Sequence, residues 1–428
     1  MTRPVLLFAL VTGLFVLTGI TQSWSVALTI LNMGVVSAIM ALGVNMQWGY
    51  AGLFNIGVMG FAALGGLAVV LTATAPVDGA MAAGGWRILG ALAVGIAALI
   101  AAVQAWRRMR RGRGLVVTVI VIAGFLLFRH IFDAGVAGVE AINPTVQGNL
   151  GGLGLPVWMA WPVGGLLAAI AAWGIGKTAL GLRSDYLAIA TLGIAEIVLA
   201  VLRNEEWLDR GVKNVIGLPR PVPYEVDLQQ SAGFVSWAQE YGFDPVTASS
   251  IVVKLCYLGL FALVLAIVML LAELALKSPW GRMMRAIRDN EVAAGAMGKN
   301  VKARHLQIFI IGSAVIGIAG AMMTTLDSQL TPASYQPLRY TFLVWVMVIV
   351  GGSGNNWGAM LGGFLIWWLW VMVEPIGQGV LSALTAPMAD GWLKAHLQDG
   401  AAHMRLLTMG VILLLVLRFS PRGLIPER

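Results

Sequence analysis

The sequence predicts an all-α fold, a polytopic bundle of transmembrane helices. Of the 428 residues, 59% are hydrophobic and 11% are charged, and the mean hydropathy is +0.84. Soluble globular chains carry about 25% charged residues, so this composition excludes that class. The 53 glycines agree with the prediction, because small residues let membrane helices approach closely. The single Cys256 excludes a disulfide framework within the chain.

Apolar runs place the helices along the chain. A span needs roughly 20 residues to cross a hydrocarbon layer of about 30 Å, and ten runs approach or exceed this length: 4–22, 25–46, 51–73, 88–106, 115–132, 157–176, 186–202, 251–273, 306–326 and 404–418. A further apolar stretch, 341–373, is interrupted by GGSGNNWG at 351–358, which predicts a broken or re-entrant helix pair. No small-residue cleavage site follows the first run, so we expect a first spanning helix and not a removed signal.

Lys and Arg in short loops predict which loops face the cytoplasm. The strongest clusters are RRMRRGR at 107–113 and the segment 277–305. With Arg3 also inside, successive crossings put 177–183 and the C-terminal residues inside, and the broken pair must enter and leave on the outer side. The net charge of +8 then reflects loops that face anionic headgroups, not a nucleic-acid footprint. The largest outer loop, 203–250, is proline-rich, and we expect an irregular lobe with one interfacial helix there.

The segment SPWGRMMRAIRDNEVAAGAMGKNVKARH, residues 278–305, is the most charged part of the chain. Ser278 followed by Pro279 predicts a helix start with a hydroxyl cap. Helical spacing gives one apolar face, formed by Trp280, Met283, Met284 and Ile287, and a polar face with Arg282, Arg285 and Asp289. We expect an amphipathic helix outside the membrane that ends near Gly295 or Gly298. Two interpretations remain open, a helix lying on headgroups and a docking helix for a cytoplasmic partner.

This segment resembles the cytoplasmic loop of ABC importer permeases. Their Glu-Ala-Ala-x-x-x-Gly pattern is present in looser form as Glu291, Ala293, Ala294 and Gly298. The run GRMMRAIRDNEVAA is similar to that of LivM-type permeases of branched-chain amino acid importers. Four further stretches support the resemblance, ALGVNMQWGYAGLFNIG (41–57), GLRSDYLAIATLGIAEI (181–197), VIVGGSGNNWGAMLGG (348–363) and FSPRGLIPER at the end of the chain.

The resemblance implies a non-enzymatic permease subunit, multi-pass in the bacterial cytoplasmic (inner) membrane, that moves a small polar organic solute inward. Branched-chain amino acids are the first expectation, although similar permeases carry urea, short amides and other small organics. The implied partners are two ABC ATP-binding subunits, a second homologous permease and a periplasmic solute-binding protein. The coupling segment would contact an ATP-binding subunit through Arg282, Met283, Met284, Arg285, Ile287, Arg288, Asp289, Glu291, Ala293, Ala294 and Gly298.

Compared with that family, the chain carries two extra spans, 88–106 and 115–132. We therefore divide it into N-terminal transmembrane helices (1–73), an inserted hairpin with a basic cytoplasmic turn and an outer loop (74–156), and a permease core (157–428). The core includes the outer loop 203–250 and the cytoplasmic coupling loop 277–305. Two spans leave the orientation of the rest unchanged, so the insertion is interpreted as a peripheral addition or a contact for another protein.

Polar residues inside predicted spans are candidates for a translocation path, because a charge in hydrocarbon costs at least about 2.5–3.5 kcal/mol and usually faces a cavity or partner. Glu196 lies in the span 186–202, with Thr191 nearby and Tyr186 at its entrance. Asn45, Gln47 and Asn55 flank a predicted helix break at WGYAG, and such breaks often face substrate. Gly354, Gly358 and Gly362 form a ladder of glycines four residues apart, which we interpret as a surface for close helix packing. Gly354 is also a candidate path residue. We interpret Trp367, Trp368 and Trp370 as an interfacial belt.

Other chemistries have little support in the sequence. AAWGIGKTALG at 171–181 resembles a phosphate-binding loop, but Ala171 replaces the first glycine and a membrane helix, not a strand, precedes it. We expect no cofactor on this chain, with ATP bound by partner subunits. The four histidines form no close ligand pair, and no metal site is expected. The alternative function is an ion- or proton-coupled secondary transporter, for which Glu196 is the obvious group; a passive channel ranks third.

Overall fold

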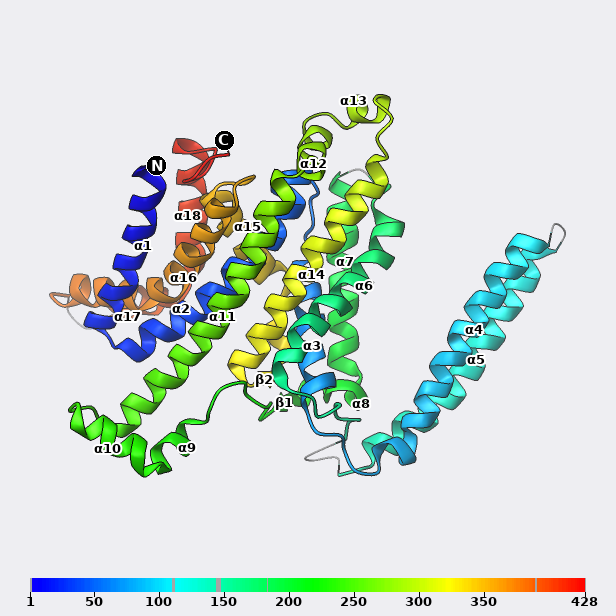
Figure 1. The fold of residues 1–428 in the computed structure, drawn as a ribbon, viewed down its shortest axis with the longest axis horizontal. Coiled ribbons are helices and arrows are strands. Elements are labelled where there is room, and N and C mark those ends of the chain that lie inside the picture. Colours follow the sequence, from blue (N-terminus) through cyan, green and yellow to red (C-terminus); the bar gives the residue numbers. More distant parts are fainter. Residues whose placement is uncertain (1, 110–111, 144–147, 183, 389–390, 428) are drawn as a thin grey trace.

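The computed structural model describes residues 2–109, 112–143, 148–182, 184–388 and 391–427. Arg110, Arg111 and Arg183, which belong to the predicted cytoplasmic clusters, lie outside the described residues. The described part is almost entirely helical, and nine of its helices are long and apolar enough to cross a membrane. The predicted all-α membrane bundle is confirmed (Figure 1).

The first three helices are α1 (Thr2–Thr21), α2 (Trp24–Ala51) and α3 (Val58–Ala73). Ser23 caps α2 by accepting a hydrogen bond from the amide of Val26 at 3.2 Å. The predicted span 51–73 is wrong in its first turn, because residues 52–57 are not helical. Gly52 adopts a left-handed conformation (φ 70°) that ends α2, a backbone shape that glycine adopts without strain.

The segment interpreted as an inserted hairpin contains a π-helical turn (Met81–Gly85), α4 (Trp86–Arg108) and α5 (Arg113–Glu140), and α4 and α5 pack against each other. Glycines let the two helices touch, since a Cβ on Gly124 would clash with the Cβ of Ala98. Figure 1 shows the pair leaning away from the other helices, and most of its apolar side chains are exposed. This surface is suited to lipid or to another protein.

The chain then forms a 3₁₀ turn (Val157–Met159), α6 (Ala160–Ala179) and α7 (Ser184–Asn204). An outer lobe follows with α8 (Glu206–Asp209), a 3₁₀ turn (Gly211–Lys213), β1 (Val215–Ile216), α9 (Glu225–Gln230) and α10 (Ala232–Glu240). β1 pairs antiparallel with β2 (Gln329–Leu330), Val215 opposite Leu330. The lobe is irregular, as predicted. The prediction of one helix in it is wrong, because extended backbone at Ser231 separates α9 from α10.

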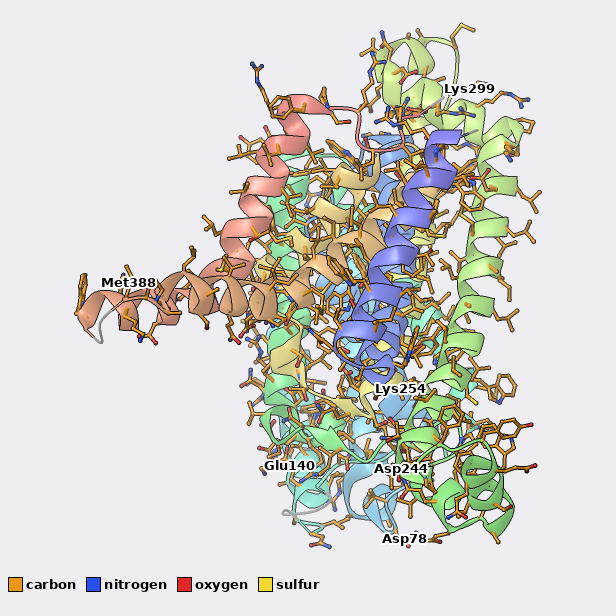
Figure 2. All side chains as sticks on the ribbon, turned by 90° about the vertical axis from the view of Figure 1, so that its left-hand side faces the viewer. Asp78, Glu140, Asp244, Lys254, Lys299 and Met388 are labelled. Atoms are coloured by element: carbon orange, nitrogen blue, oxygen red, sulfur yellow. The ribbon has the colours of Figure 1, made fainter. Side chains whose placement is uncertain are left out.

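The second half begins with α11 (Pro245–Lys277), α12 (Pro279–Asp289), α13 (Glu291–Ala296) and α14 (Val301–Asp327). After β2 and a 3₁₀ turn (Pro332–Ser334), the broken pair forms as α15 (Pro337–Gly351) and α16 (Asn356–Thr385). The chain ends with α17 (Trp392–Asp399), a 3₁₀ turn (Gly400–His403) and α18 (Met404–Phe419). Near Met388 the end of α16 projects sideways from the bundle (Figure 2).

Both chain ends, α12 and α13 lie at one end of the bundle, whereas α9, α10 and the β-strands lie at the other (Figure 1). By the positive-inside rule the first is the inner end and the second the outer end. α15 runs toward the inner end, and α16 runs back from it and ends beside the bundle part-way toward the outer end (Figure 1). The prediction that the pair both enters and leaves on the outer side therefore stays a prediction. The buried core joins α2, α3, α14, α15 and α16 in one cluster.

Candidate translocation path and coupling segment

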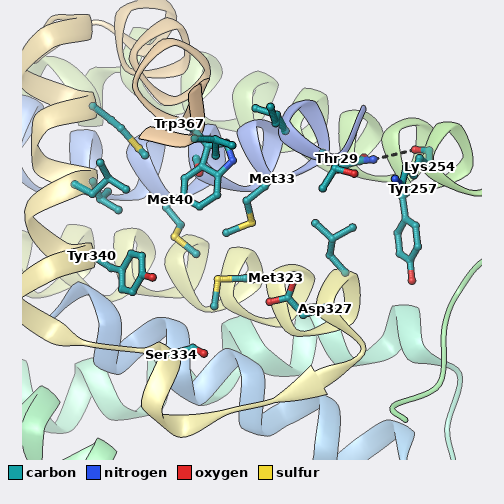
Figure 3. Close-up of a pocket in the computed structure, with 18 of the residues that line it drawn as sticks. Thr29, Met33, Met40, Lys254, Tyr257, Met323, Asp327, Ser334, Tyr340 and Trp367 are labelled. Carbon is teal, nitrogen blue, oxygen red and sulfur yellow. Dashed lines mark hydrogen bonds between the residues drawn. The ribbon is translucent and has the colours of Figure 1, made fainter. Parts of the chain in front are cut away.

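A cavity of about 510 Å³, here called the outer cavity, lies between α2, α11, α14, α15 and α16 and reaches the outer lobe. Figure 3 shows Met33 and Met40 of α2 facing Met323 and Asp327 of α14, with Tyr340 and Trp367 beside them. Methionine side chains are flexible and polarisable, and they fit apolar groups of different shapes. A mostly apolar cavity with few polar groups is the usual form of a small-molecule site.

Charged groups of both signs lie at the cavity wall. Lys254 of α11 donates to the Ser25 carbonyl at 3.1 Å and to its hydroxyl at 2.6 Å. Asp327, at the end of α14, is exposed to the cavity. Asn32 is buried and donates to the Lys254 carbonyl at 3.0 Å, while its Oδ1, in the described part of the chain, has no hydrogen-bond partner. Arg220 and Glu225 of the outer lobe also line the cavity, where they form an ion pair at 2.9 Å, so its wall carries two cationic and two anionic side chains.

Sequence reasoning missed these residues, although one signal was present. Lys254 is a single cation inside the predicted span 251–273, and it lies nearer the outer end than the inner one (Figure 2). Asp327 falls one residue beyond the predicted span 306–326. The prediction of an interfacial tryptophan belt is wrong, because Trp367 lines the cavity and Trp368 and Trp370 are buried.

The predicted path residues Asn45, Gln47 and Asn55 are fully buried and do not belong to the cavity lining. Gln47 Nε2 donates to the Phe309 carbonyl and the Ser313 hydroxyl, each at 3.0 Å, and its Oε1 accepts from Asn55 at 2.8 Å. Asn55 Oδ1 accepts from the Gly57 amide at 2.8 Å. The bond to Gly57, together with one from Trp345 Nε1 to the Asn55 carbonyl at 3.0 Å, pairs backbone groups of the non-helical segment 52–57, as the membrane interior requires.

Asn45 links α2 to the turn between α15 and α16, residues 352–355, here called the inner turn. Its Oδ1 accepts from the Gly354 amide at 2.9 Å and its Nδ2 donates to Asn356 at 3.1 Å. Asn356 in turn donates to Glu273 of α11 at 3.0 Å. Gly354 has φ 79°, and Gly358 and Gly362 pack against α15, as the ladder predicts. This polar layer lies on the inner side of the outer cavity, whose lining on α2 ends at Met40.

The three predicted path residues of α7 have different surroundings. Thr191 is buried and its hydroxyl accepts from the Ile56 amide at 3.1 Å. Tyr186 and Glu196 are exposed on the outside of the bundle and do not belong to the cavity lining. The AAWGIGKTALG stretch lies mostly within α6, so its backbone forms a helix and not a phosphate-binding loop.

The coupling segment differs from the prediction in two ways. It is two helices, because Asn290 leaves α12 with extended backbone and caps α13 through a 2.9 Å bond from the Ala293 amide. Ser278 does not cap α12 with its side chain; its hydroxyl donates to the Ala275 carbonyl at 2.6 Å. Pro279 occupies the first helical turn as predicted.

The apolar face of α12 packs into the bundle of the same chain. Met284 and Ile287 are fully buried in the main core and Met283 is half-buried against it. Arg285 donates to the Leu276 carbonyl at 3.3 Å. Arg288 pairs with Glu427 at 2.8 Å and also donates to the Gly49 carbonyl. Arg285 and Arg288 are therefore engaged within the chain.

The exposed surface of the coupling segment lies further along. Arg282, Asp289, Glu291, Ala293 and Gly298 are exposed, whereas Ala294 is buried. Two apolar side chains absent from the predicted set, Val292 and Met297, are 83% and 80% exposed. Figure 1 shows α13 beyond the inner ends of the long helices. Because the sequence predicts one continuous helix here, it did not identify Val292 and Met297 as exposed apolar side chains.

Comparison with known proteins gives the family. Residues 26–149 and 145–417 match the model described as branched-chain amino acid transport system / permease component. The chain belongs to this family. It is therefore a multi-pass protein of the inner membrane. No solved structure matches.

Curated relatives carry the LivM name. The high-affinity branched-chain amino acid transport system permease protein LivM of Escherichia coli is 30% identical over 219 residues. In that match the chain spans about half the length of the relative, 50% of each protein, and the Salmonella typhimurium LivM match has the same coverage. The probable branched-chain amino acid transport permease protein LivM of Methanocaldococcus jannaschii is 27% identical over 390 residues, 91% of this chain and 90% of the relative.

Proposed function

We propose that this protein is the permease subunit of an ABC importer that moves branched-chain amino acids inward. ATP would bind to and be hydrolysed by two separate ABC ATP-binding subunits, and a second homologous permease and an extracytoplasmic solute-binding protein would complete the importer. The chain itself would carry no cofactor and no enzymatic activity. The observation that carries this proposal is the arrangement of the coupling segment, residues 277–305. The apolar face of α12 is buried in the core, and α13 projects beyond the cytoplasmic ends of the long helices.

Val292 and Met297 are the central contacts we propose with an ATP-binding subunit. Exposed apolar side chains that project from a rigid element are typical anchors of a protein interface. Arg282 and Glu291 flank them as exposed charges, which suits the polar rim of such an interface. Because α12 is anchored through Met284 and Ile287, a displacement at α13 would be transmitted to the helices around the cavity.

The test replaces Val292 and Met297 with Asp in the full chain and measures the ATP-binding subunits that co-purify from native membranes. We expect them to be lost while the chain remains inserted. Val226→Asp, at an exposed position of α9 in the outer lobe, is the matched control and should keep them. Unchanged recovery from the double variant would contradict the proposed contact.

The outer cavity fits a zwitterion with an aliphatic side chain. Asp327 would attract an ammonium group, Lys254 and the Asn32 side chain lie where polar ends of the solute could bind, and the methionines would contact the aliphatic part. We expect Asp327→Asn and Lys254→Gln each to lower uptake of radiolabelled leucine by cells that carry the variant in place of the wild type. Asp227→Asn, an exposed carboxylate of α9, should leave uptake unchanged, and equal uptake by all three variants would exclude this site.

The exposed face of α7 is the position we propose for the second permease. It carries Glu196 together with exposed Tyr186, Ile189 and Ile197. A carboxylate that faced lipid would be costly, and a hydrogen-bond donor or cation from a neighbouring protein would remove that cost. The secondary-transporter alternative would use Glu196 as its ion site, but Glu196 lies outside the cavity lining, so we do not propose that function.

A further inference from the structure

The C-terminal residues 420–427, here called the tail, lie across the inner turn. The Leu424 amide donates to the Val350 carbonyl and the Ile425 amide to the Gly351 carbonyl, each at 2.9 Å. Asn355 Nδ2 donates to the Pro426 carbonyl at 3.1 Å. Ile425 is buried, and its carbonyl is in close contact with Gly352. The tail is therefore bonded to both sides of the α15–α16 junction.

The end of the tail is held by the coupling segment. Glu427 Oε2 lies 2.8 Å from Arg288 Nη1, and the same nitrogen donates to the Gly49 carbonyl near the end of α2. Both side chains of the pair are about three-quarters buried, with 24% and 29% exposure. Arg288 thus joins α12, α2 and the tail at one point. Such partly buried, charge-assisted contacts hold geometry better than exposed ion pairs do.

Gly354 allows this arrangement. A Cβ at Gly354 would lie 2.7 Å from Glu427 Oε2 and 3.3 Å from Arg288 Nη1, so a larger residue would push the pair apart. A more open pocket of about 590 Å³ lies at the same place, and Ser353, Arg288, Glu427 and Asp185 line it. The inner turn is consequently covered on its cytoplasmic side by the tail and held on its other side by Asn45.

We propose that the tail is a latch, closed over the inner turn by the Arg288–Glu427 pair, and that movement of α12 opens it. The inner turn lies between the outer cavity and the cytoplasm, so releasing the tail would loosen the layer that closes the path. This role rests on the proposed function, because an ATP-binding subunit must move α12. Arg288 and Glu427 would act as positioning residues and need not touch the solute.

The test uses the isolated full chain in nanodiscs and therefore does not depend on the importer partners. Cys256 is replaced by Ala and the buried tail residue Ile425 by Cys, and the rate at which a membrane-impermeant maleimide labels the new cysteine is measured. We expect Glu427→Gln to raise this rate about tenfold, which corresponds to about 1.4 kcal/mol. Glu427→Asp, which keeps the carboxylate, should stay closer to the parent rate than Glu427→Gln does.

Asp133→Asn is the matched control, because it removes the carboxylate of an exposed ion pair with Arg129 on α5, far from the latch. It should leave the labelling rate unchanged. A Glu427→Gln rate equal to that of this control would overturn the latch and leave the proposed function untouched. If the Glu427→Gln labelling rate is raised but no ATP-binding subunits co-purify, the latch is supported and the proposed importer function is contradicted.

Discussion

Met284 provides the sharpest test of how the coupling segment is anchored. Its side chain lies on the buried face of α12, has 0% exposure and belongs to the main core. Truncation of a buried methionine to alanine costs about 2–5 kcal/mol. Even the lower limit, about 2 kcal/mol, would raise the equilibrium constant for local opening of α12 about 30-fold. Met283, on the same helix but half-buried, should cost about 1 kcal/mol or less.

The assay is hydrogen–deuterium exchange of the α12 amides in the purified full chain. We expect Met284→Ala to lose protection in α12 while α14 and α16 stay protected, and Met283→Ala to raise exchange in α12 by about fivefold or less. Cells with Met284→Ala should also show reduced leucine uptake, since a helix that opens locally transmits displacement poorly. Equal exchange in the two variants would refute the anchoring of α12 through its buried face.

Three further outcomes test other parts of the structure. Gln47→Leu should lower the midpoint of thermal unfolding, because it removes the acceptor of the buried Asn55 amide and the donor to the buried Ser313 hydroxyl, at about 1–3 kcal/mol for a buried group left without a partner; an unchanged midpoint would contradict the network. Gly317→Val should prevent close packing, since a Cβ there would lie 2.5 Å from the Gly164 carbonyl, whereas Gly193→Val, in open space, should fold normally as judged by size-exclusion chromatography. Burial raises the pKa of Asp209 in the outer lobe to about 7, so the folded state binds more protons between about pH 4 and 7 and stability should fall as pH rises through that window; Asp209→Asn should flatten this dependence in thermal scans.

The sequence predicts the spans well, because length and apolarity alone decide whether a helix can cross the membrane. It predicts a helix break at WGYAG (48–52), but α2 continues to Ala51 and the non-helical backbone is residues 52–57, so that α3 starts at Val58. That boundary depends on buried partners such as Thr191, 135 residues away from Ile56. Local sequence could not reveal such a bond.

The candidate site was less predictable for the same reason. Trp367, Trp368 and Trp370 are neighbours in sequence, but successive helical positions point in different directions, so one lines the cavity, one bonds to Thr18 at 2.9 Å and one packs near Tyr340. The Arg288–Glu427 pair joins residues 139 apart. Several polar residues that were predicted to line the path instead accept hydrogen bonds from amides of non-helical backbone.

We propose that this protein moves its solute only together with separate ATP-binding subunits. The most direct measurement is purification of the tagged chain from its native membrane in mild detergent, with cross-linking, followed by identification of every co-purifying protein by mass spectrometry. We expect recovery of ATP-binding subunits and a second permease, and loss of the ATP-binding subunits from the variant with Val292 and Met297 replaced by Asp. Recovery of the chain alone, with the coupling segment accessible to protease, would contradict it.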